Sequence, residues 1–204
     1  MPAYFNLSVQ FRRKDLYPLF VRDFYAMLDR AGMAFQSGYW GFEKDSLEEI
    51  IEWNQRKLED DFKLEFTEHH SHDYKQVIYG FGSYSEVRGF WMNNYPESGA
   101  FTHEIILPES DVLEKEYPAK FKKEKMEELL ELTMRIWQFP LVKAIQTGLE
   151  GNDASVSLSK LTEGEYPNIL PFALVEDMGN HYEGSICNIR HLADGRNGLL
   201  FLRK

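Results

Sequence analysis

Two β-rich runs, Gln76-Val-Ile-Tyr-Gly-Phe81 and Glu86-Val-Arg-Gly-Phe-Trp-Met92, flank the turn-forming residues Gly82-Ser-Tyr-Ser85. Strand-like runs on either side of a short glycine-containing turn predict a β-hairpin. Residues 93–99 are dense in Asn, Pro and Gly, and another β-rich run follows at Phe101–Leu107. Together with a weaker alternation at Lys63–Thr67, this stretch predicts an antiparallel meander.

On the amino-terminal side of the meander, one strand, two helices and a loop are predicted. Apolar residues alternate with polar ones between Phe5 and Phe11, which is the period of a half-buried strand. A helix that Asp15 could cap should end at Gly32, and the glycine- and aromatic-rich segment 36–41 should be a loop. Ser46 and Glu49 form a capping-box pattern that begins the second helix. The apolar stripe of the first helix would comprise Leu16, Leu19, Phe20, Phe24, Met27 and Leu28.

On the carboxyl-terminal side, Pro118 should begin a third helix that Pro140 breaks or kinks, and Leu141–Leu149 should continue as a short helix. The remaining chain reads as short strands. The whole pattern predicts a single α+β domain over residues 1–204, with a mostly antiparallel sheet and about three to four helices packed on it. The predicted last strands are Ser155–Lys160, Leu170–Val175, Gly184–Ile189 and Leu199–Leu202.

The net charge of the 204-residue chain is −10, and the acidic excess is concentrated in two windows. Between Glu43 and Glu68 there are ten acidic and four basic residues, and between Glu104 and Glu131 there are nine and five. Nucleic acids and anionic lipids bind clustered Lys and Arg, so we expect neither nucleic acid nor membrane as a partner. A cationic protein would suit this charge, although acidity also serves solubility alone.

Cysteine usage and hydropathy favour a cytoplasmic location. Cys187 is the one cysteine, so no internal disulfide can form. No stretch approaches the roughly 18 apolar residues that a membrane span needs. The basic residues near the start follow the apolar ones, whereas a signal peptide has the opposite order.

The segment that most suggests catalysis is Glu68-His-His-Ser-His-Asp73, because no nucleophile elbow or phosphate-binding loop is present. His70 and His72 would share one face of a strand, and His103 could supply a third metal ligand. A metal-dependent enzyme built on these three histidines is therefore one alternative. The other interpretation of the segment is a polar turn, and that interpretation implies no cofactor.

Two groups of residues suggest a surface that binds another protein. The second predicted helix could present one negative stripe, unless its charges are simply a solvated face. The turn after the hairpin combines aromatic rings with amides, as contact surfaces do, unless its rings pack inside the sheet. The candidate partner-binding residues are Glu48, Glu52, Glu59 and Asp60 on the helix, and Trp91, Asn93, Asn94 and Tyr95 at the turn.

The segment Gly89-Phe-Trp-Met-Asn-Asn-Tyr-Pro-Glu-Ser-Gly-Ala-Phe-Thr-His-Glu-Ile-Ile-Leu-Pro-Glu-Ser-Asp111 resembles a pattern of bacterial immunity proteins from polymorphic toxin systems. In that pattern, a Trp-containing strand meets an Asn/Pro/Gly turn, followed by a β-run that ends in Pro-Glu-x-Asp and then a helix. The resemblance implies a small cytoplasmic binding protein that covers the active site of a toxin, often a basic nuclease. It transfers no site residues.

The leading hypothesis is therefore a non-enzymatic binding protein of the immunity type, whose partner is a basic toxin domain. The metal-dependent enzyme is the first alternative. A subunit or scaffold protein that dimerises through the Trp91 surface is the second.

Overall fold

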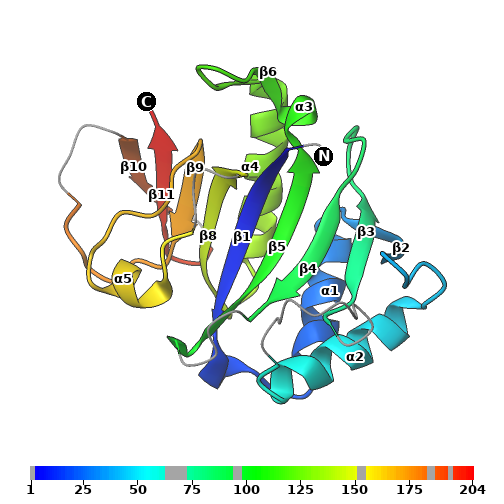
Figure 1. Cartoon of the computed structure of the whole chain (residues 1–204). Coiled ribbons are helices and arrows are strands. Elements are labelled where there is room, and N and C mark those ends of the chain that lie inside the picture. Colours follow the sequence, from blue (N-terminus) through cyan, green and yellow to red (C-terminus); the bar gives the residue numbers. More distant parts are fainter. Residues whose placement is uncertain (1–2, 63–72, 94–97, 151–154, 183–186, 193–194) are drawn as a thin grey trace.

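The computed structural model describes residues 3–62, 73–93, 98–150, 155–182, 187–192 and 195–204 (Figure 1). Nine strands form one sheet in the order β10-β11-β9-β8-β1-β5-β4-β3-β2, and all neighbours are antiparallel. The strands of this sheet are β1 (Tyr4–Arg12), β2 (Ala34–Tyr39), β3 (Gln76–Gly80), β4 (Arg88–Met92), β5 (Ala100–Pro108), β8 (Val142–Leu149), β9 (Phe172–Val175), β10 (Cys187–His191) and β11 (Leu199–Arg203). A separate ribbon pairs β6 (Leu113–Lys115) with β7 (Lys120–Phe121).

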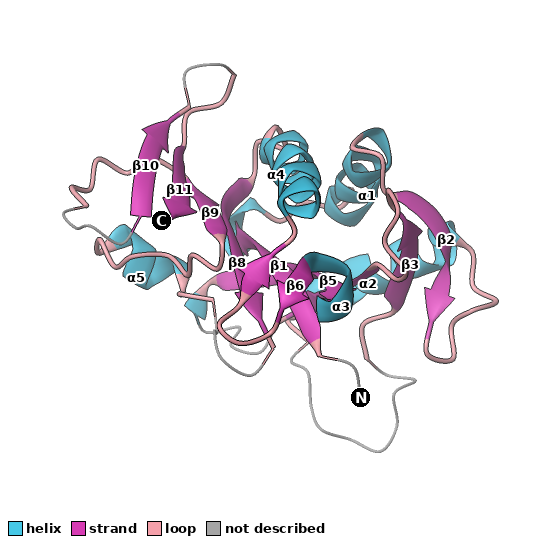
Figure 2. Ribbon diagram, turned by 90° about the horizontal axis from the view of Figure 1, so that it is seen from above, coloured by secondary structure: helices cyan, strands magenta, loops and turns pink. Residues whose placement is uncertain are grey.

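Three helices longer than ten residues occur in the described part of the chain, and they pack beside this sheet. Figure 2 shows α1 and α4 on one face of the sheet and α5 on the other. Among the described residues, none of the helices combines the length and apolarity that crossing a membrane requires. The helices are α1 (Phe20–Arg30), α2 (Leu47–Glu59), α3 (Glu109–Val112), α4 (Lys123–Trp137) and α5 (Leu158–Thr162), with a 3₁₀ turn at Arg13–Asp15.

Each face of the sheet has its own apolar core. The larger core lies under α1, α2 and α4, and it receives the alternating residues of β1, from Phe5 to Phe11, which have no exposed surface. The smaller core lies under α5 and includes Leu161 and Phe201. Outside the smaller core, the face of the sheet that carries α5 is polar along the paired strands β1 and β5.

The predicted α+β class with a mostly antiparallel sheet is confirmed. The hairpin is also confirmed, since β3 and β4 pair antiparallel, and β4 in turn pairs antiparallel with β5. The predicted strand Lys63–Thr67 lies outside the described residues.

Five element predictions are wrong. Asp15, predicted to cap the first helix, lies in the 3₁₀ turn Arg13–Asp15, and α1 begins at Phe20 with Leu19 as its N-cap residue. Segment 36–41 was predicted as a loop, but most of it belongs to β2, where Gly38 is required because a Cβ there would lie 2.0 Å from the Phe42 carbonyl oxygen. Leu141–Leu149, predicted as a helix, forms β8, and Ser155–Lys160, predicted as a strand, leads into α5. The third long helix begins at Lys123, after β7, instead of at Pro118.

Candidate functional site

The acidic residues that the sequence suggests for partner binding are exposed on helix α2. Its start is fixed by a capping box: the Ser46 hydroxyl accepts from the Glu49 N–H at 3.3 Å, and a Glu49 carboxylate oxygen accepts from the Ser46 N–H at 2.8 Å. Apolar residues of α2 such as Ile50 and Leu58 are buried in the larger core. The helical spacing places the predicted acids on the opposite side. The exposed acids are Glu48, Glu52, Glu59 and, at the helix end, Asp60.

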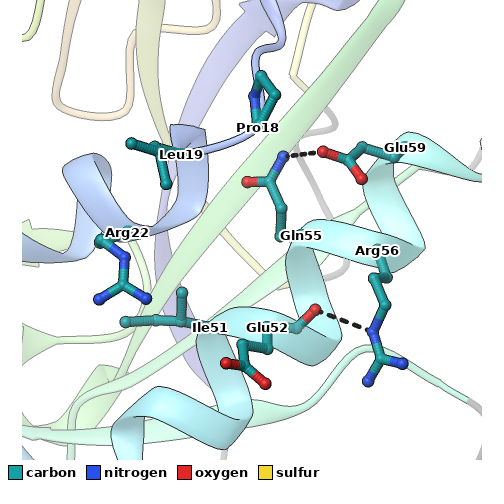
Figure 3. A pocket seen from close by; sticks show the side chains of 8 residues that line it. All are labelled: Pro18, Leu19, Arg22, Ile51, Glu52, Gln55, Arg56 and Glu59. Carbon is teal, nitrogen blue, oxygen red and sulfur yellow. Dashed lines mark hydrogen bonds between the residues drawn. The ribbon is translucent and has the colours of Figure 1, made fainter.

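A groove with a volume of about 490 Å³ lies between the start of α1 and the outward face of α2 (Figure 3). Part of its lining is apolar and includes Leu19, which is 55% exposed. The rest is charged or polar. The full lining comprises Pro18, Leu19 and Arg22 from the α1 side, and Ile51, Glu52, Gln55, Arg56 and Glu59 from α2.

Ion pairs neutralise only part of this acidic surface. Arg22 donates to both carboxylate oxygens of Glu48, with Nη1 2.9 Å from Oε2, and this contact raises the pKa of the guanidinium. Glu59 accepts from the Gln55 amide at 2.7 Å (Figure 3). Among the described residues, neither Glu52 nor Glu59 has an ion-pair partner.

Glu52 and Arg56 are spaced four residues apart, as a helical ion pair requires, but their side chains do not form one. The Arg56 Nε donates instead to the backbone carbonyl of Glu52 at 3.3 Å (Figure 3). The Arg56 guanidinium lies over the Trp53 ring, 5.9 Å from its centroid. The Glu52 carboxylate is therefore left available at the rim of the groove.

This arrangement is suited to binding. Two carboxylates that form no ion pair within the described residues line the same groove as an exposed aliphatic side chain, so a basic surface with an apolar residue would complement the groove. The lining residues include no Ser, Cys or His that could pair as nucleophile and base.

The second predicted surface is only partly described, and its described members are buried. Trp91 is 1% exposed, and its indole N–H donates to the Tyr25 hydroxyl at 3.0 Å inside the larger core. Asn93 is equally buried, and its amide donates to the Phe62 carbonyl at 3.0 Å. These two side chains cannot contact a partner on the folded surface, because the pleat turns Trp91 toward α1. Asn94 and Tyr95 lie outside the described residues.

His103 is a core residue on β5. Its ring has no exposed surface and lies 4.5 Å from the Trp91 ring and 5.1 Å from that of Phe24, centroid to centroid. Burial lowers its pKa to about 3. The described part of the chain contains no cluster of three potential metal ligands. His70 and His72 lie outside the described residues, so the metal-dependent alternative stays a prediction.

The sequence interpretation missed Leu19 as a surface residue. Its spacing fits the apolar stripe of α1, but the helix begins one residue later, at Phe20, and Leu19 is the N-cap residue. Pro18 is the signal that could have indicated this boundary, because proline disfavours helical geometry in the residue before it and is common at helix starts.

Comparisons with known proteins give one structural similarity. No family model matches the chain, and no curated protein matches it. Among solved structures, the Pseudomonas aeruginosa T6SS protein PA0821 is similar over 98% of this chain, with a TM-score of 0.42 and 10% sequence identity. The chain spans 65% of the length of that protein.

Proposed function

We propose that the chain is a non-enzymatic binding protein of the immunity type, which neutralises a cationic protein toxin in the cytoplasm. The toxin would dock on the α1–α2 groove. The observation that carries this proposal is that Glu52 and Glu59, which form no ion pair within the described part of the chain, line the same groove as the exposed side chain of Leu19.

The physical argument combines charge with shape. Carboxylates at a rim attract a basic partner over several ångströms and accelerate its association. An exposed aliphatic residue next to them supplies apolar area that becomes buried on docking. Arg22 and Arg56 at the same rim would add specificity, because only a partner whose acidic and basic groups match this alternation avoids like-charge contacts.

Co-expression tests the proposal. The chain would be produced together with the C-terminal domain of any large secreted protein that is encoded next to it, and cell survival would be measured. We expect the unaltered chain to protect and the double variant Glu52→Lys, Glu59→Lys to lose protection. In binding experiments, the same variant should associate on the order of tenfold more slowly.

A charge-matched control separates the groove from net charge. Glu124 and Glu131 are exposed on α4, and reversing both changes the net charge by the same amount. The control variant should protect as well as the unaltered chain. Equal association rates for the two double variants would show that the groove is not the docking site, and the absence of any complex or protection with the unaltered chain would refute the function itself.

A further inference from the structure

The α5 face of the sheet carries a row of paired side chains at its centre. The register places Ser8 of β1 opposite Glu104 of β5, and Glu104 opposite Phe90 of β4. On its other side, Ser8 lies opposite Gln146 of β8. Residues that are opposite each other in a sheet point to the same face, so these four side chains form one continuous row.

A pocket of about 440 Å³ lies over this row. The sheet forms one wall, and the segment that leads into α5 forms the other with Ser155 and Ser157. Phe90, Met92 and Ile106 give the sheet wall an apolar part. A volume of this size, with mostly apolar walls and a few polar groups, is typical of sites for small molecules.

Gln146 fixes the second wall against the sheet. Its buried amide accepts hydrogen bonds from the N–H groups of Val156 at 3.1 Å and Asn168 at 2.8 Å, and it donates to the Val156 carbonyl at 2.8 Å. Gln10 donates to the same carbonyl at 3.0 Å. These bonds hold the pocket open in one shape, and a preformed pocket lowers the entropic cost of binding a ligand.

Glu104 is the one ionisable side chain among the described residues of the pocket lining. Its Oε1 accepts from the Ser8 hydroxyl at 2.7 Å, whereas its Oε2 is buried and accepts no hydrogen bond of good geometry. Burial raises the pKa of this carboxyl, and the hydroxyls of Ser8 and Thr102 offset part of that rise. No Lys, Arg or His is found among the described residues of the lining. A recessed carboxylate without a cation destabilises a fold, and such groups concentrate at functional sites.

Arg88 lies on the same face of β4 but is engaged elsewhere. Its guanidinium forms an ion pair with Glu86 at 2.9 Å and lies over the rings of Tyr4 and Tyr39, at 4.5 and 4.6 Å from their centroids. The cation that would balance Glu104 therefore has to come from outside this strand.

We propose that the pocket binds a small organic cation, an ammonium or amidinium group on a flat apolar body. The cation would donate to Glu104 and the apolar body would pack against Phe90 and Met92. A charge-assisted hydrogen bond to Oε2 satisfies the buried oxygen, and the serine hydroxyls can accept the remaining N–H groups. The site shares no lining residue with the α1–α2 groove, so it does not depend on the proposed function.

Benzylamine, benzyl alcohol and benzoate test this proposal as matched probes, titrated into the isotopically labelled full chain at about pH 7 and followed by NMR. We expect benzylamine to bind on the order of tenfold more tightly than benzyl alcohol, with benzoate weaker than both. The shift changes should be centred on β1, β4 and β5. Glu104→Gln should bring benzylamine down to the affinity of the alcohol and leave the affinity of the alcohol unchanged, which also shows that the variant is folded.

Two further variants keep the test decisive. Phe90→Ala should weaken benzylamine and benzyl alcohol together, because it removes only apolar contact. Glu109→Gln neutralises another carboxyl whose pKa burial raises, outside the pocket, and should change nothing. Equal binding of amine and alcohol, unchanged amine binding by Glu104→Gln, or no saturable binding of any probe would overturn the proposal. Amine-induced shifts confined to α2 would do the same, because they would indicate attraction to surface acids only.

Discussion

His103 stands among Phe24, Tyr25 and Trp91 with no exposed surface, and burial lowers its pKa to about 3. In the unfolded chain, the same imidazole titrates near its ordinary value of about 6.5. Below that pH the unfolded chain binds a proton that the folded chain does not. The free energy of unfolding therefore falls as the pH falls from about 6.5 toward about 3, and this contribution is fully regained above about 6.5.

Replacing His103 by Leu should remove this component. We expect the unaltered chain to lose about 1.4 kcal/mol per pH unit more than His103→Leu between about pH 6 and 4.5, as measured by urea unfolding. His181 is exposed, so His181→Asn is the control and should keep the original slope. Parallel pH profiles for the unaltered chain and His103→Leu would contradict the assignment.

At the level of single residues, the sequence predicted that the acids of α2 form an exposed stripe, but it did not predict the pocket around Glu104. Glu104 is one of 33 acidic residues, and nothing in its neighbours along the chain distinguishes it. What distinguishes Glu104 is its hydrogen bond with Ser8, which lies 96 positions away in the sequence and opposite Glu104 in the sheet. Trp91 shows the converse, because an aromatic at a turn looks like a contact residue until the pleat direction is known.

Elements whose residues alternate with the period of their structure were predicted directly, whereas the buried strand β8 was missed, although the fully buried β9 was predicted from its apolar run. Strand β1 and helix α2 alternate apolar and polar residues with the periods of their structures, and both were predicted. Strand β8 is buried along nearly its whole length, because the larger core covers one of its faces and the smaller core, under α5, covers the other. Its residues therefore show no period of two, and the preceding helical pattern was wrongly extended into it.

The capping box of α2 gives a test at the level of one element. Ser46→Ala removes one hydroxyl and two hydrogen bonds. That hydroxyl accepts from the Glu49 N–H and donates to the Glu49 carboxylate at 2.7 Å. We expect a loss of about 1 kcal/mol in the free energy of unfolding, measured by urea denaturation, and a loss of only a few tenths for Ser46→Gly. Ser110→Ala, on an exposed side chain without a capping role, is the control. Identical stability of Ser46→Ala and the unaltered chain would show that tertiary packing alone fixes the helix start.

Across the whole molecule, the described acids of the two windows form ion pairs to a similar extent: Asp45, Glu48 and Asp61 are paired in the first window, and four acids are paired in the second. Helix α4 carries several of the acids of the second window, and three of them lie near a basic residue of the same helix: Glu127 near Lys123, Glu128 near Lys125 and Glu131 near Arg135. On α2, Glu48 is paired, whereas Glu52 and Glu59 are not. The first window nevertheless has the larger acidic excess, with ten acidic and four basic residues, so the long-range field is expected to be negative around α2.

This negative field predicts a salt-dependent association with the proposed cationic toxin domain. Between about 50 and 500 mM salt, the association rate of the unaltered chain should fall steeply, because the screening length shortens to a few ångströms. The double variant Glu52→Lys, Glu59→Lys should show a shallower salt dependence, whereas the α4 control should follow the unaltered chain. Stopped-flow measurement gives all three rates, and a salt-independent rate for the unaltered chain would argue against steering by these carboxylates.

The position of β1 at the middle of the sheet has a kinetic consequence. Its two neighbours, β5 and β8, come much later in the chain: Ser8 bonds to Glu104 across 96 positions, and Gln10 meets Gln146 across 136. During synthesis, β1 therefore emerges with both of its edges unpaired. More than a hundred further residues must be made before both of its neighbouring strands are present. Such distant pairings make folding slow and leave an apolar, unpaired strand exposed to other chains in the meantime.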